Sequence, residues 1–557
     1  MKGKRWAVLT SYGIVLSLLL SACSPGTGGG SNTEEASRPP DEGQHSQQYE
    51  ADPFGTYDPP VQLHIARPVD QSWTYPGGDS IEDNIWYREY RNLLGIEIIH
   101  DWTALPGEYN RKLNVMIALG SLPEMFSVSA AQLKGLADAD QLEDLTKVYE
   151  RYASDRTKKL QMGDGGAALA SATFNGKLLA IPIVNAPIYE ANLLWVRTDW
   201  LERLGLPEPG TLEEVFAIAE AFAKEDPDGN NQADTFGLAL NNYLYGGFAS
   251  LTGFFNAFHA YPQTWIKEGN GQVIYGSIQP EMKHALGKLQ EMYKTGQLDR
   301  EFGVKDSNQV MEDITGNKLG MTFGANWNPY VFLDAVRHNP GMEWKPFPVP
   351  SVDGMPAKAS VGFSASGYVV VRKGFEHPET VVKMLNLHEE VVHGARRGEG
   401  EFITMEGDGG ERINTSRLSI VQSGVSNEDV AESLSLLREA IQNEDESLLK
   451  DALTETDKYG PALDYLNTGN MENWDVAHQY FGFEITMDHY SGDRLLMTAF
   501  GGQTPTMTEK WAMLDRLEKE TFTKIIMGAV SIDEFDSFVK EWNRLGGKAI
   551  LEEINEP

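Results

Sequence analysis

The chain has 557 residues, and its 81 acidic residues outnumber its 47 lysines and arginines, giving a formal net charge of −34. Such a charge repels nucleic acid and anionic lipid, and no nucleic-acid-binding motif opposes this reading. Composition therefore argues against nucleic acid as a partner. Hydrophobic residues make up 41% of the chain, which is enough for packed cores, and this length predicts two or more domains.

The N-terminus has the parts of an export signal. Positions 2, 4 and 5 are basic, and residues 7–20 form a mostly apolar stretch. This stretch is shorter than the roughly 20 residues of a membrane span and suits a secretory signal. Leu20-Ser21-Ala22-Cys23 then resembles a lipobox, where signal peptidase cuts before a lipidated cysteine. We expect residues 1–22 to be a signal peptide, and Cys23 to carry the lipid that anchors the protein at the extracellular face of the cell membrane.

An ordinary signal peptide with a chance cysteine is the alternative. Cys23 is the only cysteine, so it cannot form an internal disulfide, and its place after a small-residue cleavage site accounts for it. Residues 23–58 are rich in Gly, Ser, Pro, Glu and Gln, which predicts a flexible tether. The folded part should begin near residue 59.

The first elements alternate between strands and helices. Alternating apolar residues predict strands, and glycines follow two helical patterns as stops. In chain order we expect a strand at 61–65, a helix at Ser80–Leu94 before Gly95, a strand at 96–98, a helix at Tyr109–Leu119 before Gly120, and a buried strand at Met125–Val128. This alternation predicts a largely parallel α/β sheet. Capping-box sequences at Thr211–Glu214 and Ser531–Glu534 mark two later helix starts.

An acidic loop follows the first of these capped helices. Its oxygen-bearing residues have the spacing of a Ca²⁺ loop, in which one position binds through its backbone carbonyl. The predicted ligands of a structural Ca²⁺ are Asp226, Asp228, Asn230, Gln232 (through its carbonyl) and Asp234. Gly237 stands where an EF-hand places its bidentate Glu, so that ligand is missing or comes from elsewhere. An acidic surface turn is the alternative.

No catalytic motif is complete. His388 and His393 resemble a zincin pair, but a separation of five places them roughly 140° apart around a helix, so we interpret this segment as a solvated helix end. Gly362–Gly367 lacks the spacing of a nucleophile elbow, and no Walker or dinucleotide loop is present. We therefore expect no enzyme, although a catalytic carboxylate pair stays open in so acidic a chain.

Segments across most of the folded chain resemble, in order and spacing, the extracellular solute-binding proteins of ABC importers. They are most similar to the family 1 type, in the large Gram-positive lipoprotein group related to alginate-oligosaccharide-binding proteins. The segments are Tyr109–Glu124, Asn175–Pro182, Asn192–Leu201, the Asp226 loop, Gly320–Trp327, Gly367–Val371, Gln503–Thr506 and the helix after Ser531.

The resemblance implies an α/β, two-lobed periplasmic-binding-protein-like fold (type II) with a hinge and an interlobe cleft. Lobe 1 would comprise about 59–185 and about 363–425. Lobe 2 would comprise about 186–362, with C-terminal helices at about 426–557. The implied function is capture of an extracellular oligosaccharide by a monomer that delivers it to ABC permease subunits. The alternatives are a surface glycosidase or lyase, and a sensor or adhesion lipoprotein without a transporter.

A cleft for sugars requires aromatic platforms and polar side chains. Trp327 resembles the family's cleft tryptophan, and Ser129 could donate a hydrogen bond from a strand end. The expected ligand-binding residues are Trp327, Tyr189, Asn192, Tyr243, Tyr245, Trp265, Trp474 and Ser129. For each of them, burial in a core is the alternative.

Overall fold

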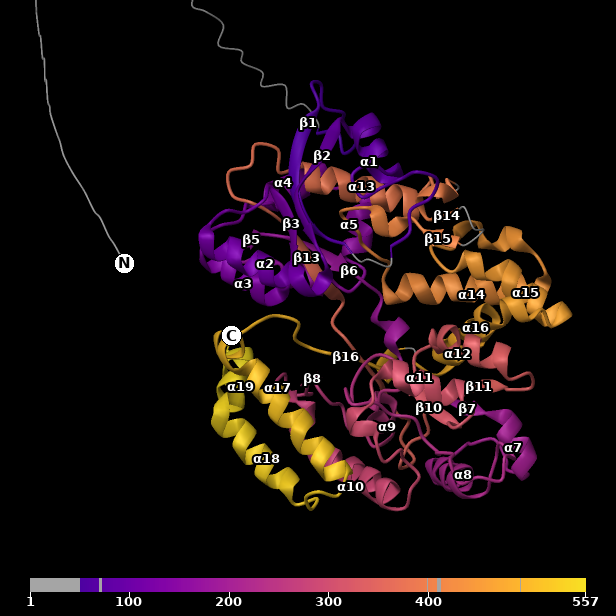
Figure 1. The fold of residues 1–557 in the computed structure, drawn as a ribbon. Helices are drawn as coiled ribbons and strands as arrows, with labels where there is room; N and C mark the ends of the chain where they lie inside the picture. The colour runs from indigo at the N-terminus through magenta and orange to yellow at the C-terminus, as the bar shows by residue number, and fades with distance from the viewer. Residues whose placement is uncertain (1–50, 70–72, 398, 408–411, 491, 557) are drawn as a thin grey trace, which may run out of the picture. The chain divides into compact units, whose positions relative to one another are not determined.

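The computed structural model describes residues 51–69, 73–397, 399–407, 412–490 and 492–556 (Figure 1). From Ala51 onward the chain forms one compact unit. The predicted signal peptide, Cys23 and most of the predicted tether lie outside the described residues.

The first sheet belongs to lobe 1 and has five strands in the order β2-β1-β3-β13-β6. Its strands are β1 (Val61–Pro68), β2 (Ile96–Ala104), β3 (Met125–Val128), β6 (Ile181–Val184) and β13 (Ala365–Val371). β1 runs parallel to β2 and β3, whereas β13 is antiparallel to β3 and β6. The three strands expected in the first part of the chain are therefore confirmed, and β1, β3 and β6 end at the same edge of the sheet.

Helices cover the lobe 1 sheet, and the longest pack into its core. They are α2 (Pro106–Leu119), α3 (Ala130–Asp138), α4 (Thr146–Tyr152), α5 (Asp155–Gln161), α6 (Ala167–Ser171) and α13 (Thr380–Val392). The predicted helix before Gly120 is confirmed, since Gly120 takes the left-handed conformation that ends α2. The helix that carries His388 and His393 is not solvated: these side chains are 4% and 8% exposed, because α13 packs within the core.

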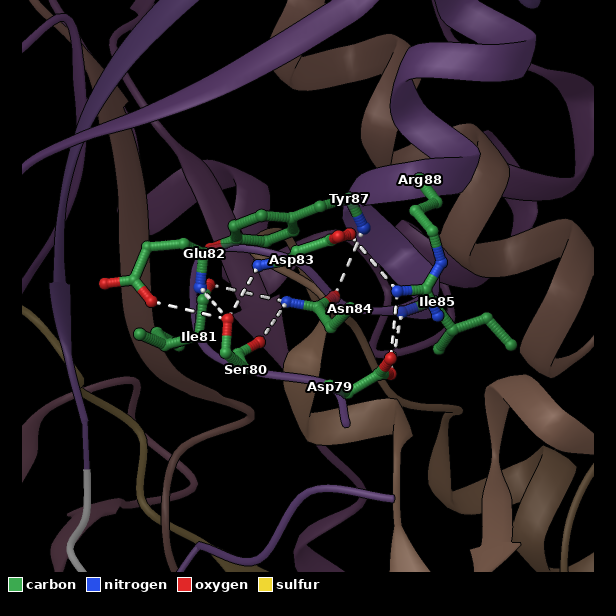
Figure 2. Close-up of polar contacts among 9 residues, drawn as sticks. All are labelled: Asp79, Ser80, Ile81, Glu82, Asp83, Asn84, Ile85, Tyr87 and Arg88. Atoms are coloured by element: carbon green, nitrogen blue, oxygen red, sulfur yellow. Dashed lines mark hydrogen bonds and ion pairs between the residues drawn. The ribbon is translucent and has the colours of Figure 1, made fainter. Parts of the chain in front are cut away.

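The helix expected from Ser80 begins later. Asn84 caps α1 (Ile85–Glu89) by accepting the Tyr87 N–H, and a π-helical turn, η1 (Tyr90–Leu94), continues it to Gly95. Figure 2 shows why residues 80–83 stay outside the helix: the Ser80 hydroxyl accepts the backbone N–H groups of Glu82 and Asp83. Serine and asparagine side chains compete in this way with helical hydrogen bonds.

The central sheet of lobe 2 has the order β10-β7-β11. Its strands are β7 (Leu193–Arg197), β10 (Met321–Gly324) and β11 (Trp344–Phe347), and both pairings are antiparallel. The largely parallel sheet expected from the first elements is therefore found for β1, β2 and β3 of lobe 1, whereas the sheet of lobe 2 is antiparallel. Long helical segments separate β7 from β10, so no short crossover fixes a parallel direction.

The helices of lobe 2 include one that starts as predicted. They are α7 (Thr198–Leu204), α8 (Leu212–Lys224), α9 (Thr252–Ala257), α10 (Pro280–Lys294), α11 (Ser307–Thr315) and α12 (Asn328–His338). The capping box before α8 is confirmed: Thr211 Oγ1 accepts the Glu214 N–H at 3.2 Å, and the Glu214 carboxylate accepts the Thr211 N–H at 2.9 Å.

Six further α-helices follow residue 426 in the described part of the chain. They are α14 (Asn427–Asn443), α15 (Tyr459–Thr468), α16 (Trp474–His489), α17 (Pro505–Ile526), α18 (Glu534–Trp542) and α19 (Lys548–Asn555). α16 packs against α12 and β11, and α17 packs against α10, as Figure 1 shows. The capping box expected at Ser531 is wrong, because α18 begins only at Glu534 and its N-cap residue, Asp533, makes no side-chain cap bond.

Short strand pairs complete the structure. They are β4 (Thr173–Phe174) with β5 (Lys177–Leu178), β8 (Trp265–Lys267) with β9 (Val273–Tyr275), β12 (Ala359–Val361) with β16 (Leu495–Met497), and β14 (Thr404–Glu406) with β15 (Arg412–Asn414).

Three segments cross from the lobe 1 sheet toward lobe 2, at 184–190, 360–366 and 421–427. They lie side by side: the Asn185 N–H donates to Ser364 O at 2.8 Å, and the Gly424 N–H donates to Val184 O at 2.7 Å. The Ile188 N–H donates to Asn427 Oδ1 at 2.9 Å. These bonds join the crossing segments into one strap, which we call the crossover.

The last residues of the predicted tether are bound to lobe 1. The Lys383 ammonium donates to Gly55 O at 2.6 Å, and the Tyr57 hydroxyl donates to Glu379 at 2.7 Å. The Asn386 amide donates to Pro53 O at 3.0 Å. The expected boundary at residue 58 is therefore corrected: the chain is held from residue 53, because α13 supplies polar side chains that receive it.

Candidate functional site

One cavity of about 340 Å³ opens on the lobe 2 side of the crossover. The elements around it are the short 3-10 helix η2 (Pro187–Glu190), the start of α12, and β12. It brings together Trp327 and Asn192, two of the predicted ligand residues. The other lining residues are Glu190, Gly246, Gly247, Thr252, Pro262, Gln263, Thr264, Ala325, Ser360, Val361, Gly362 and Thr498.

Trp327 and Asn192 have the features of a sugar site. Trp327 follows β10 as the N-cap residue of α12 and is only half-buried, so part of its ring faces the cavity. Asn192 is 8% exposed; its amide N–H donates to Glu190 O at 2.9 Å, but its Oδ1 has no hydrogen-bond partner in the described structure. A buried acceptor without a partner is costly, and a ligand hydroxyl would satisfy it.

Glu190 joins the cavity to the crossover. Its carboxylate accepts the Gly362 N–H at 3.1 Å, which ties the first crossing segment to the second. Gly246 and Gly247 line the opposite side with φ of 69° and 68°, a left-handed turn that glycine adopts readily. The sequence showed no motif for either feature, because the lining residues come from segments far apart in the chain.

Three predicted aromatic residues lie in cores instead. Trp474 is 0% exposed and stacks on His478 at 4.0 Å, and Trp265 is 6% exposed and packs on Tyr275 at 4.7 Å. Tyr245 packs against Phe255, and its hydroxyl is buried. The structure therefore corrects the assignments of Trp474 and Trp265, whose rings are buried among aromatic neighbours, and places the partly buried Tyr245 outside the cavity.

The remaining predicted residues lie outside the cavity. Tyr189 belongs to η2, but its hydroxyl donates to Glu455 at 2.6 Å and its ring meets Phe483. The Ser129 hydroxyl forms the capping box of α3, which explains its place after β3. Tyr243 is 58% exposed and lies near the Gly246 turn in sequence without lining the cavity.

A second cavity, of about 300 Å³, lies on the lobe 1 side. Its walls are the last residues of β1 and the first three residues of β3, together with Pro106, Ile183 of β6, Val369 of β13 and the segment at the start of the third crossing. Its polar and aromatic residues are Arg67, Trp73, Phe126, Ser127, Arg417, Ser419 and Gln422. No sequence motif marks these residues. In α/β folds, ligands bind at the carboxyl ends of strands. This general rule is the only indication from the sequence that a ligand site lies at this edge of the sheet.

Hydrogen bonds within the acidic loop link Asp226, Asp228 and Asp234 to its two asparagines. Asn230 Nδ2 donates to Asp228 at 2.7 Å and to Asp234 at 3.2 Å, and the Asn230 and Asn231 N–H groups donate to Asp226. Partial burial raises the pKa of the Asp228 carboxyl, and the neighbouring Asp226 and Asp234 add to this rise.

The donor set of this loop suits a hard cation, but its spacing is incomplete. A Cβ at Gly237 would lie 2.2 Å from Ala219 O, so no side chain can supply a ligand from that position. Across the described part of the chain, no group of three or more His, Cys, Asp or Glu residues is arranged to hold a metal. A bound ion would therefore depend on the Asn230 oxygen and a backbone carbonyl besides the carboxylates.

The segment from His388 to His393 places His388 and Glu389 in the core of lobe 1. Burial lowers the pKa of His388 to about 3 and raises that of Glu389 to about 8. His388 and Glu389 lie on the core side of α13, and neither lines the cavities at the crossover. Within the described residues, no helix is both long and apolar enough to cross a membrane.

Two α/β lobes with cavities on either side of a shared crossover define a solute-binding protein. The sequence matches the family of bacterial extracellular solute-binding proteins over residues 104–387, about half of the chain, and the chain belongs to this family. It is 23% identical over 476 residues to the polygalacturonan/rhamnogalacturonan-binding protein YtcQ of Bacillus subtilis, covering 84% of this chain and 87% of the relative. It is 24% identical over 468 residues to the lipoprotein LipO of the same organism, covering 83% and 86%.

Solved structures show the same fold. The alginate-binding protein AlgQ2, in a crystal structure without calcium ion, superposes with a TM-score of 0.58 at 15% identity, covering 90% of this chain and 99% of that one. An EF-hand mutant of the Streptococcus pneumoniae binding protein FusA, in complex with fructo-nystose, gives a TM-score of 0.58 at 15% identity, covering 88% and 97%. The two-lobed periplasmic-binding-protein-like fold expected from the sequence is therefore confirmed.

Proposed function

We propose that this protein captures an extracellular oligosaccharide and delivers it to the permease subunits of an ABC importer. The observation that carries the proposal is the lobe 2 cavity, which is lined by the half-buried Trp327 and by Asn192, whose buried Oδ1 has no hydrogen-bond partner in the described structure. Sugars present apolar ring faces beside hydroxyl groups, and such a cavity offers a surface for each. Saccharide-binding relatives and saccharide-bound structural neighbours support this class of ligand.

The same proposal assigns no reaction to the protein. Trp327 and Asn192 are binding groups, and in the described lining of the cavity Glu190 is the one carboxylate. Its oxygen already accepts the Gly362 N–H. Cleavage of a glycosidic bond ordinarily uses two carboxylates about 5 to 9.5 Å apart, so the lining supports binding rather than hydrolysis.

We further propose that the protein acts as a lipid-anchored monomer. Cys23 would carry the lipid, and the segment from residue 24 to about 52 would leave the folded part free to reach solutes. Lobe 1 (about 59–185 and 363–425) would close on lobe 2 (about 186–362, with the helices of 426–557) around the crossover. The similarity to LipO, named as a lipoprotein, supports the anchor.

Structural Ca²⁺ at the acidic loop completes the proposal. Asp226, Asp228, Asn230 and Asp234 would bind through side-chain oxygens, and Gln232 through its carbonyl. The chemistry of the ion would be to neutralise the clustered carboxylates and fix the loop after α8. The hydrogen bonds that hold Asp226, Asp228 and Asp234 around Asn230 support the assignment.

The test is a calorimetric titration of the mature protein with a panel of oligosaccharides. At least one should bind, and Trp327→Ala should weaken its binding by about 1–3 kcal/mol if the ring stacks on a sugar. The matched control is Trp102→Ala, which removes another half-buried tryptophan, on β2 of lobe 1 and outside both cavities. Unchanged affinity in Trp327→Ala, or release of cleavage products from any panel member, would reject the proposal.

A further inference from the structure

The lobe 1 cavity carries a positive charge in a strongly acidic protein. Arg67 and Arg417 line it, and none of its described lining residues is acidic, although the chain as a whole has a net charge of −34. The cavity lies at the edge where β1, β3 and β6 end and where the crossover leaves the sheet. It therefore faces the same interlobe region as Trp327.

Arg67 is a buried cation held only by neutral groups. It is 6% exposed, and its guanidinium donates to the Tyr87 hydroxyl at 3.0 Å and to Leu418 O at 2.7 Å. It also donates to Arg417 O at 2.6 Å and to Ser419 O at 3.1 Å. The described structure contains no carboxylate within ion-pair distance of it. Neutral acceptors fix the position of a guanidinium but leave its charge uncompensated.

The hydroxyl that receives Arg67 is itself fixed. Asn84 caps the helix that carries Tyr87, as Figure 2 shows, and the Tyr87 hydroxyl also contacts His100 Nε2 at 2.8 Å. Arg88 pairs with Asp79 at 2.9 Å and holds the start of this helix. The positive charge at Arg67 is therefore built into the fold.

Arg417 and Trp73 add a second cation and an aromatic surface. The guanidinium carbons of Arg67 and Arg417 lie 5.4 and 5.5 Å from the centre of the Trp73 ring. Arg417 Nη2 makes one long bond, at 3.4 Å, to Thr74 O, and its buried Nε has no partner among the residues that the structure describes. The Nε–H and Nη2–H groups of an arginine form the fork that binds a carboxylate through two parallel hydrogen bonds.

We propose that the oligosaccharide captured by this protein is acidic, with a uronate carboxylate bound by Arg417 and a sugar face resting on Trp73. This inference rests on the proposed function and names its substrate class. Arg67 keeps the electrostatic potential of the cavity positive. It does not contact the ligand, because its Nη1 and Nη2 groups already donate hydrogen bonds within the protein. An uncharged sugar would bring no charge to these guanidinium groups, whereas a uronate brings a negative charge and the acceptor that Arg417 Nε lacks among the described residues.

The test compares two forms of one ligand on the mature protein. Trigalacturonate and its fully methyl-esterified form have the same chain and linkage, and only the first has charged carboxylates. Calorimetric titration at constant ionic strength should give at least about tenfold tighter binding of the acid, because hydrogen bonds between charged groups are the stronger ones. Arg417→Gln should remove this preference, so that the acid and the ester bind the variant with similar affinities.

Arg91→Gln is the matched control. It removes the same charge from lobe 1 at an exposed position outside the cavity, where Arg91 meets Glu97 at 3.8 Å, and the preference for the acid should survive. Thermal unfolding of Arg417→Gln checks its fold. If that variant does not fold, the comparison of acid and ester on the unaltered protein still decides.

The outcomes separate this inference from the proposed function. Equal binding of acid and ester, or tight binding of neutral oligosaccharides alone, would overturn the acidic ligand and leave oligosaccharide capture standing. Retention of the acid preference in Arg417→Gln would overturn the assigned residue and, with it, the proposal. Absence of binding to any saccharide, acidic or neutral, would overturn both.

Discussion

Glu389 is a fully buried acidic side chain of lobe 1. It is 0% exposed on α13, and neither carboxylate oxygen has a hydrogen-bond partner in the described structure. Burial raises its pKa to about 8, although His393 and Arg156 act in the opposite direction and Asp429 adds to the rise. The folded protein therefore holds a proton on Glu389 at a pH where the unfolded chain has lost it.

We expect the stability of the protein to fall as pH rises from about 4.5 to about 8, because the native state must then either keep this proton or bury a charge. Glu389→Gln removes the effect. It should raise the free energy of unfolding by about 1–3 kcal/mol at pH 8.5 and change it little at pH 5. Denaturant unfolding at both pH values measures this. Glu432→Gln, at an exposed position on α14, is the control, and an equal gain at both pH values would contradict the prediction.

The two cavities differ in how far the sequence could reveal them. Trp327 and Asn192 lie in segments whose spacing resembles a known family, and the structure places both at one cavity. Arg67 and Arg417 are 350 positions apart, and only the folded chain brings the Arg67 guanidinium to the Arg417 carbonyl. Trp474 and Trp265 were selected by residue type alone, which cannot separate a ligand platform from a core ring.

At the scale of elements, the local sequence predicts where several helices and strands begin and end within one lobe. Gly120 stops α2, and Thr211 starts α8, through bonds that span a few residues. The direction of β7, β10 and β11 could not be predicted, because it depends on where long helical segments return the chain. Ser531 shows a further limit: its capping-box pattern is present, but two turn residues intervene before α18.

This contrast gives a matched pair of substitutions. Thr211→Ala removes the hydroxyl that accepts the Glu214 N–H at 3.2 Å, and it should cost about 1 kcal/mol of stability. Ser531→Ala, at the same position of the same sequence pattern, removes no cap and should change stability by less than about 0.5 kcal/mol. Denaturant midpoints of the two variants and the unaltered protein measure both effects. Equal losses would show that α18 starts at Ser531 after all.

The acidic loop after α8 leads to a prediction about Ca²⁺ and stability. Saturating Ca²⁺ should stabilise the protein by about 2.7 kcal/mol at a hundred times its dissociation constant, and a chelator should reverse the gain. Asp228→Asn should abolish the calorimetric heat of Ca²⁺ binding, while Asp138→Asn, an exposed carboxylate of α3 in lobe 1, should leave it intact. No heat at millimolar Ca²⁺ in the unaltered protein would reject the site and leave an acidic turn.

For the whole molecule, the two cavities explain why closure of the lobes should require a ligand long enough to reach both of them. One wall offers Trp327 and Asn192, and the other offers Trp73 and Arg417. A ligand shifts a conformational equilibrium only by the difference between its affinities for the two states. A monosaccharide that occupies one wall binds the open and closed forms alike, whereas an oligosaccharide that contacts both walls binds the closed form more tightly.

We therefore expect the radius of gyration, measured by small-angle X-ray scattering, to fall when a bound oligosaccharide saturates the protein and to stay unchanged with the corresponding monosaccharide. Trp327→Ala should need a higher oligosaccharide concentration for the same fall, because it weakens contact with one wall alone. Ca²⁺ should not reproduce the change, since the acidic loop follows α8 and lines neither cavity. A fall in the radius of gyration with the monosaccharide would show that contact with one wall is enough to close the two lobes.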